Sequence, residues 1–316
     1  MILEGFEKNK KILDNKKLFL VCGRSFDKLA FAEDIKKLNP VRFGNFRPNP
    51  LYEEVLDGVD LFNKSECGTI LAVGGGSAMD VAKSIKYYSK SNAEIIAIPT
   101  TSGTGSESTH FAVIYRDGVK QSVADLSLLP DIVILEPSTL KNVPEYTRKA
   151  TMLDALCHAI ESYWAKKATE ESKAIAVSAI SQVLANKESY LANEISGNAG
   201  MLKAANLAGQ AINLTTTTAG HAMCYKITSL FGFAHGHAAA LCLPEVWKIN
   251  KTEIPGITLD EFIELFEGLN LDYPVSETRE KDLDVLVESV NPQRLGNNPV
   301  ALDKDTIRQI YERIIR

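Results

Sequence analysis

The stretch TILAVGGGSAMDVAKSIKYY, residues 69–88, places a strand, a glycine turn and a helix in immediate succession. The apolar run at residues 69–73 is typical of a buried strand, and the pattern at residues 78–88 is typical of a helix. Three glycines separate them. A strand that enters a helix through such a turn indicates the β-α unit of an α/β domain.

Four further short apolar runs have the same strand signature, at residues 18–22, 94–98, 111–115 and 131–135. The sequence Arg116-Asp117-Gly118 follows the third run and predicts a hairpin turn. Strands that alternate with helical patterns predict a mainly parallel sheet in this half of the chain.

Beyond about residue 144 the composition changes, and strand-like alternation gives way to long alanine-rich segments. These predict helices at residues 148–167, 170–192, 200–214 and 219–230, with an amphipathic stretch at 259–269. We therefore predict an α/β domain over residues 1–145 and an all-α domain over residues 146–316.

The overall composition limits the class of protein. A net charge of −5 over 316 residues argues against a nucleic-acid-binding surface, which needs a basic face. The N-terminus has no apolar signal segment, and no apolar run is long enough to span a bilayer. The five cysteines form no CxxC pair and are expected to be reduced thiols. We expect a cytoplasmic protein without nucleic-acid or membrane partners.

The glycine turn is a candidate phosphate-binding loop. The backbone N–H groups of Gly74, Gly75 and Gly76 precede a helix whose N-terminus favours an anion. Ser77 and Asp80 have the spacing of a capping box. The alternative is a tight turn that binds nothing.

A second loop, PTTSGTGSE at residues 99–107, follows its own predicted strand. Loops at the carboxyl ends of parallel strands face the ligand crevice of an α/β sheet. Together the two loops could bind the pyrophosphate and ribose of a dinucleotide. A serine- and threonine-rich loop without a ligand remains the alternative.

The turn after the first predicted strand bears on the choice of cofactor. NAD-binding domains commonly place an acidic residue there to bind the ribose 2′-hydroxyl. Here Arg24 and Ser25 occupy the turn, and the first carboxylate is Asp27. We predict that Arg24 and Ser25 hold a 2′-phosphate, so that NADP(H) is preferred over NAD(H). A solvent-facing arginine is the alternative.

One carboxylate and several histidines form a candidate metal site. Asp154 and His158 are four residues apart in a predicted helix, so both project from one face. Glu161, one turn further, could orient a ligand. Convergence with His221 and His235 would give an oxygen and nitrogen ligand set suited to Fe(II) or Zn(II). The alternative is a helix-surface pair with core histidines.

Five segments, taken in order, resemble the iron-containing (group III) alcohol dehydrogenase family. They are residues 74–83, 98–107, 130–135, 154–161 and 221–236. The resemblance implies a dinucleotide-binding domain, a helical metal- and substrate-binding domain and an active site between them. It also implies a single Fe(II) or Zn(II) ion held by Asp154, His158, His221 and His235.

The same resemblance assigns roles around the cofactor. Gly74, Gly75 and Gly76 would hold the pyrophosphate, while Thr100, Thr101 and Thr104 would line the adenosine and nicotinamide path. Lys120 resembles a family lysine near the cofactor phosphates or ribose. We also expect a homodimer.

One position departs from the family pattern. Many members carry a histidine four residues after the third metal ligand, where this chain has Tyr225. That histidine is often assigned to proton transfer. Here Tyr225, His237 or a bound water is expected to take this role, or Tyr225 shapes the substrate pocket instead.

A narrower resemblance concerns the substrate. Residues 46–50, 215–218, 231–241 and 291–299 resemble the hydroxyethylphosphonate dehydrogenase (phosphonoacetaldehyde reductase) group. The implied reaction converts phosphonoacetaldehyde to 2-hydroxyethylphosphonate, with Arg47, Arg294 or residues 215–218 near the phosphonate. The alternatives are a short-chain alcohol, lactaldehyde or glycerol dehydrogenase, a dehydroquinate-synthase-type lyase, and an inactive relative.

Overall fold

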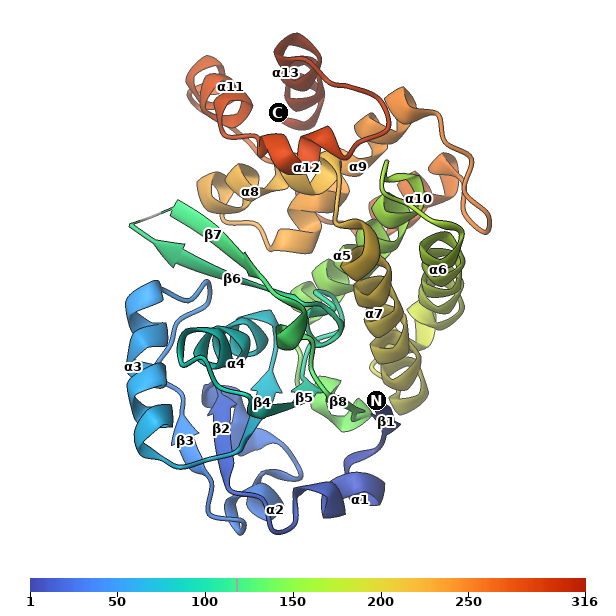
Figure 1. Ribbon diagram of the computed structural model, residues 1–316. Coiled ribbons are helices and arrows are strands. Elements are labelled where there is room, and N and C mark those ends of the chain that lie inside the picture. Colours follow the sequence, from blue (N-terminus) through green and yellow to red (C-terminus); the bar gives the residue numbers. More distant parts are fainter. Residues whose placement is uncertain (118) are drawn as a thin grey trace.

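Six strands form one parallel sheet in a computed structural model that describes residues 1–117 and 119–316 (Figure 1). Their spatial order is β1-β8-β5-β4-β2-β3. The strands are Ile2–Glu4 (β1), Leu18–Cys22 (β2), Val41–Phe43 (β3), Thr69–Gly74 (β4), Glu94–Pro99 (β5) and Ile132–Leu135 (β8). The predicted parallel sheet is therefore confirmed.

Both faces of the sheet are buried, which explains why the strands are continuous apolar runs. Leu18 and Leu20 of β2 belong to the core beneath α1 (Phe6–Asn9) and α2 (Ala32–Lys36). Phe19 between them points to the other core, which is covered by the helices Tyr52–Lys64 (α3) and Gly76–Tyr88 (α4). Successive side chains of a strand alternate between faces, so β2 contributes to both layers.

An antiparallel hairpin stands apart from the sheet and extends toward the helical part (Figure 1). It consists of Phe111–Arg116 (β6) and Val119–Ala124 (β7), with Tyr115 opposite Lys120. The predicted hairpin is confirmed, although Gly118 of its turn lies outside the described residues.

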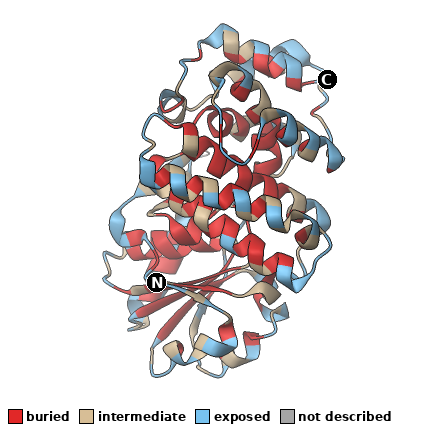
Figure 2. Cartoon of the chain, turned by 90° about the vertical axis from the view of Figure 1, so that its right-hand side faces the viewer, coloured by how far each residue is buried: buried red, intermediate tan, exposed pale blue. Residues whose placement is uncertain are grey.

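The second half of the chain is helical, as predicted, and buried residues run through its centre (Figure 2). Among the described residues, no helix is long and apolar enough to cross a membrane. The helices are Glu145–Trp164 (α5), Glu170–Leu191 (α6), Ile195–Thr215 (α7), Ala219–Phe231 (α8), His235–Asn250 (α9), Leu259–Gly268 (α10), Arg279–Glu288 (α11), Pro292–Gly296 (α12) and Lys304–Ile314 (α13).

The two parts meet at a close backbone contact. Gly105, with φ of +58°, lies against Gly209 of α7, and a Cβ on Gly105 would sit 2.4 Å from the Gly209 Cα. A side chain on either residue would separate the loop from the helix. The last strand ends at Leu135 and α5 begins at Glu145. We propose that the domains divide at residue 145, where α5 begins.

Candidate active site

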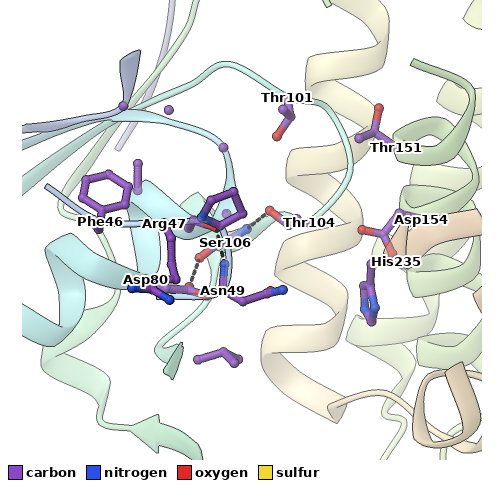
Figure 3. Close-up of a pocket in the computed structure, with 18 of the residues that line it drawn as sticks. Phe46, Arg47, Asn49, Asp80, Thr101, Thr104, Ser106, Thr151, Asp154 and His235 are labelled. Carbon is purple, nitrogen blue, oxygen red and sulfur yellow. Dashed lines mark hydrogen bonds between the residues drawn. The ribbon is translucent and has the colours of Figure 1, made fainter. Parts of the chain in front are cut away.

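A cavity of about 1270 Å³ lies between the sheet and the helices. Its sheet side includes the segments after β2, β3, β4 and β5, and its helical side includes α5, α8 and α9. The β6–β7 hairpin and α12 also contribute lining residues. Figure 3 shows Thr104 and Asp80 on one side of this space and Asp154 and His235 on the other. The carboxyl ends of parallel strands thus face the helical residues across one crevice.

The two predicted loops are direct neighbours in this cavity. A Cβ added to Gly75 would lie 3.0 Å from Thr101 Oγ1, and one added to Gly76 would lie 3.0 Å from Thr104 Cγ2. Gly75 caps α4 and provides no side-chain hydrogen bond. The first N–H groups of α4 therefore lack a side-chain cap, which is the arrangement of a phosphate site at a helix N-terminus.

The predicted capping box is wrong, because α4 begins at Gly76 and its N-cap is Gly75. Ser77 Oγ instead accepts a hydrogen bond of 3.4 Å from the Asn49 backbone N–H. Asp80 accepts one of 2.9 Å from the Ser106 hydroxyl, as Figure 3 shows. Both residues line the cavity.

A buried lysine, which the sequence analysis did not single out, anchors the loop at residues 99–107, which we call the threonine loop. Lys83 Nζ donates to the hydroxyls of Ser106 and Thr109, each at 3.1 Å, and to the Phe111 carbonyl at 3.0 Å. Burial lowers the pKa of Lys83 to about 8, so it remains mainly protonated at pH 7. Its charge and hydrogen bonds hold the loop against α4.

Three other residues predicted to contact the cofactor lie at the rim of the cavity or outside its described lining. Arg24 and Ser25 are exposed and line the rim of the cavity. Thr100 is absent from the lining among the described residues, and its backbone N–H donates to the Gly74 carbonyl at 3.0 Å. Thr100 therefore joins the two loops through its backbone.

Asp27 does not face the cavity. Its carboxylate binds Arg42 and Lys36, each at 2.9 Å. The hydrogen bond from Arg42, followed by that from Lys36, lowers the pKa of Asp27 to about 2. Because the Asp27 carboxylate binds these two cations, Arg24 and Ser25 are the polar side chains of this turn that lie at the rim of the cavity.

Three predicted metal ligands converge on one point. One donor atom from each of Asp154, His158 and His221 lies within 4.8 Å of the others, and all three residues are buried. Asp154 Oδ1 is 3.4 Å from His221 Nε2 and 4.0 Å from His158 Nε2. Two complete helices, α6 and α7, separate these histidines in the sequence, and the fold stacks their rings with centroids 4.4 Å apart.

The face of α5 that carries this group extends toward the sheet. Thr147 and Thr151 line the cavity together with Asp154 and His158. The spacing of four, three and four residues places them along one helix face. The sequence analysis missed both threonines, although the same spacing rule would have identified them.

Glu161 fixes the orientation of His221. Glu161 Oε2 accepts from His221 Nδ1, and Oε1 accepts from the His221 backbone N–H at 3.2 Å and the Thr218 hydroxyl at 2.8 Å. Burial opposes protonation of His221, but Glu161 and Asp154 raise its pKa to about 9. Glu161 thus directs His221 Nε2 at Asp154, as an orienting carboxylate does in metal sites.

His235 lies beside the group of three. Its ring is 5.2 Å from the His221 ring, and its Nδ1 is 3.5 Å from Cys224 Sγ. Burial lowers the pKa of His235 to about 3 and that of His158 to about 4. The neutral imidazoles of His158 and His235 retain the lone pairs that a metal ligand needs, and His221 would release its Nε2 proton when a cation binds, so this buried set fits Fe(II) or Zn(II).

The structure brings Tyr225 to the cavity and not His237. The Tyr225 ring stacks on His235 with centroids 5.4 Å apart. His237 is absent from the lining of the part of the cavity that is described, and its Nδ1 is 3.1 Å from the Tyr146 hydroxyl. Its ring packs against Phe233 and Phe266. The expected catalytic position of His237 is not supported.

Comparison with known proteins identifies the family. Residues 3–137 match the family described as iron-containing alcohol dehydrogenase, and residues 149–258 match the C-terminal part of the same family. The 1,3-propanediol dehydrogenase of Citrobacter freundii is 31% identical over 290 residues, which cover 83% of this chain and 74% of that protein. The chain belongs to the iron-containing alcohol dehydrogenase family.

Two further proteins are similar to this chain. The aldehyde-alcohol dehydrogenase 2 of Entamoeba histolytica is 31% identical over 271 residues, or 74% of this chain, but the match spans only 31% of that longer protein. The sulfoacetaldehyde reductase of Bifidobacterium kashiwanohense, solved with NAD⁺, is 26% identical. It superposes with a TM-score of 0.88 over 99% of this chain and 96% of its own.

Proposed function

We propose that this protein is a metal-dependent oxidoreductase that interconverts an aldehyde and a primary alcohol with a nicotinamide cofactor. The observation that carries the proposal is one cavity with two kinds of site. The buried group of Asp154, His158 and His221 lies at its helical side, and the uncapped N-terminus of α4 lies at its sheet side. The alcohol dehydrogenases among its relatives support this reaction.

Each part of the cavity has a role in this reaction. When bound, a divalent metal supplies a Lewis acid for the carbonyl oxygen and a reduced nicotinamide supplies hydride. Gly75 and Gly76 hold the pyrophosphate, with Thr101 and Thr104 beside it. Tyr225 is the side chain from which we propose that the product alkoxide receives its proton, because it lines the cavity next to His235.

The reaction is tested by metal analysis of the purified protein together with an aldehyde panel and both reduced nicotinamides. We expect about one transition metal ion per chain and metal-dependent oxidation of the nicotinamide. Metal-loaded protein that oxidises neither nicotinamide with any aldehyde would contradict the proposal and favour the inactive relative. Turnover of a cyclising substrate without net oxidation would favour the lyase.

The proposed preference for NADP(H) depends on the rim of the cavity. Arg24 and Ser25 are exposed there, and Asp27 is bound to Arg42 and Lys36. We expect Arg24→Ala to raise the KM for NADPH about 10-fold, because one charge-assisted contact with the 2′-phosphate is lost. The KM for NADH should change little. Unchanged NADPH affinity would show that Arg24 only faces solvent.

For the substrate we propose phosphonoacetaldehyde, with 2-hydroxyethylphosphonate as the alcohol. The sulfoacetaldehyde reductase supports this choice, because the substrate in its name is also a two-carbon aldehyde with an anionic group. Lactaldehyde, butanal and glyceraldehyde are the neutral alternatives. Equal kcat/KM values for phosphonoacetaldehyde and these aldehydes would contradict the choice.

We further propose a homodimer in a reducing compartment such as the cytoplasm. The five cysteines are free thiols. One edge of β1 faces β8, and the opposite edge has no partner strand among the described residues. A single-chain mass in sedimentation equilibrium would contradict the dimer.

A further inference from the structure

Two cations lie against one aromatic ring in the cavity. Lys120 of β7 places Nζ 3.4 Å from the centroid of the Tyr225 ring, and Arg294 of α12 places Cζ 5.6 Å from it. Tyr225 itself belongs to α8, so three elements distant in sequence converge here. All three residues line the cavity.

Neither cation has an acidic partner. Among the residues that the structure describes, no carboxylate lies within ion-pair distance of Lys120 or Arg294. Arg47, elsewhere in the same cavity, contrasts with them because it binds Glu54 at 2.7 Å. Burial, followed by the charge of Arg294, lowers the pKa of Lys120 to about 8. Lys120 is thus mainly a cation at pH 7 and is repelled by a second one.

Two half-buried like charges without a counterion are costly, and a bound anion would offset this cost. The hydroxyl of Thr217 adds a further polar group. Arg294 Nη1 donates to Thr217 Oγ1, which leaves the Thr217 proton free to donate to a ligand. Arginine and lysine around a hydroxyl donor form a site suited to a phosphonate, sulfonate or carboxylate.

The position of this site separates it from the cofactor phosphates. The Tyr225 ring that contacts both cations stacks on His235, beside the metal-ligand group. The phosphate loop is formed by Gly75 and Gly76 with their threonine neighbours, at the sheet side of the cavity. An anion between Lys120 and Arg294 therefore lies at the substrate end.

The geometry points to Lys120 and Arg294 as the subsite that binds the anionic tail of a short aldehyde substrate. The ring of Tyr225, which contacts both cations and stacks on His235, joins this subsite to the candidate metal ligands. This inference rests on the proposed function and identifies the residues that select its substrate. Because the cations and His235 contact the same aromatic ring, we expect only a short carbon chain between the carbonyl and the anion. Lys120 then contacts substrate, in place of the cofactor role that the family resemblance implies.

The test uses metal-loaded enzyme and four aldehydes: phosphonoacetaldehyde, sulfoacetaldehyde, 3-oxopropanoate and the neutral propanal. We expect the wild type to favour at least one anionic aldehyde over propanal. Lys120→Met and Arg294→Met should each lower kcat/KM for that aldehyde about 30-fold or more, which is the usual effect of removing one partner of a close charge pair. Their kcat/KM for propanal should stay within about 3-fold of the wild type.

Lys281→Met is the matched control, because Lys281 is exposed on α11 and forms no ion pair among the described residues. It should leave all four values unchanged. If the variants lower turnover of charged and neutral aldehydes equally, or raise only the KM of the nicotinamide, the subsite is wrong while the proposed function stands. If the wild type oxidises no nicotinamide with any aldehyde, the proposed function itself fails.

A binding measurement distinguishes the anions without turnover. Calorimetry of the metal-loaded protein with ethylphosphonate, ethanesulfonate and propanoate should show binding of at least one, weakened about 30-fold or more in Arg294→Met. Tighter binding of ethylphosphonate assigns a phosphonate tail, and tighter binding of ethanesulfonate assigns a sulfonate tail. Equal affinity of wild type and variants for all three anions would overturn the inference.

Discussion

The Asp154→Asn variant is expected to lose its bound metal and to lose at least about 1000-fold in kcat/KM for any aldehyde. Lewis-acid stabilisation of a developing alkoxide contributes several kcal/mol, and each 1.36 kcal/mol corresponds to about tenfold in rate. Asp154 is the only carboxylate in the buried group of three, and although burial opposes its ionisation, the adjacent imidazoles of His158 and His221 hold its pKa below the usual value. We therefore expect the ionised oxygen to be the anionic ligand.

Asparagine retains the shape of Asp154 but removes its charge, so the substitution tests metal binding with little change in packing. Metal content should be measured after gel filtration, with kcat/KM measured on the same sample. Asp260→Asn is the matched control, because Asp260 is exposed in the first turn of α10. If Asp154→Asn retains full metal content and activity, the ligand set lies elsewhere in the cavity.

The sequence predicted the sheet well where strands are buried on both faces. Four of the five predicted runs became the sheet strands β2, β4, β5 and β8, and the fifth became β6 of the hairpin, because short apolar runs bounded by turns are typical of buried strands. The edge strands β1 and β3 were missed. Each has three residues, too few to show the alternation of apolar and polar residues that marks a strand. Each becomes a strand by pairing with the edge of a strand elsewhere in the sequence.

The candidate site shows the same division between local and distant information. The pair Asp154 and His158 follows from spacing on one helix, whereas their meeting with His221 depends on how α9 packs against both α5 and α8. His237 lies outside the described lining of the cavity because its segment is helical, which the sequence analysis did not predict. In α9, a residue two positions after His235 points to nearly the opposite side, away from the cavity.

Two features of the charged side chains also escaped the sequence analysis. Lys83 occupies a helix position that looks solvent-exposed, and only the fold shows that it lies inside the threonine loop. The pairing of Lys120 and Arg294 about Tyr225 joins a hairpin strand to a short helix near the C-terminal end. No local sequence pattern connects segments so far apart, so the proximity of these two cations becomes visible only in the folded structure.

The second large effect is expected at a residue that binds nothing. Gly236 of α9 lies so close to α5 that an added Cβ would be 2.1 Å from the Ala150 carbonyl oxygen and 2.5 Å from the Asp154 Cβ. We expect Gly236→Ala to push the start of α9 away from α5 and to separate His235 from Asp154. Overpacking of this kind costs about 1–3 kcal/mol, and a displaced ligand should weaken metal binding about 10-fold or more.

Thermal unfolding and metal titration of the same Gly236→Ala protein measure both consequences. A drop in Tm of roughly 2–12 °C is expected, from about 2–4 °C per kcal/mol in larger domains. Gly268→Ala is the control, since nothing lies within 4 Å of its Cβ position and alanine favours the helix. A lower Tm with unchanged metal affinity would show that α9 can shift without moving His235. Loss of both would show that metal binding depends on the close contact between α5 and α9.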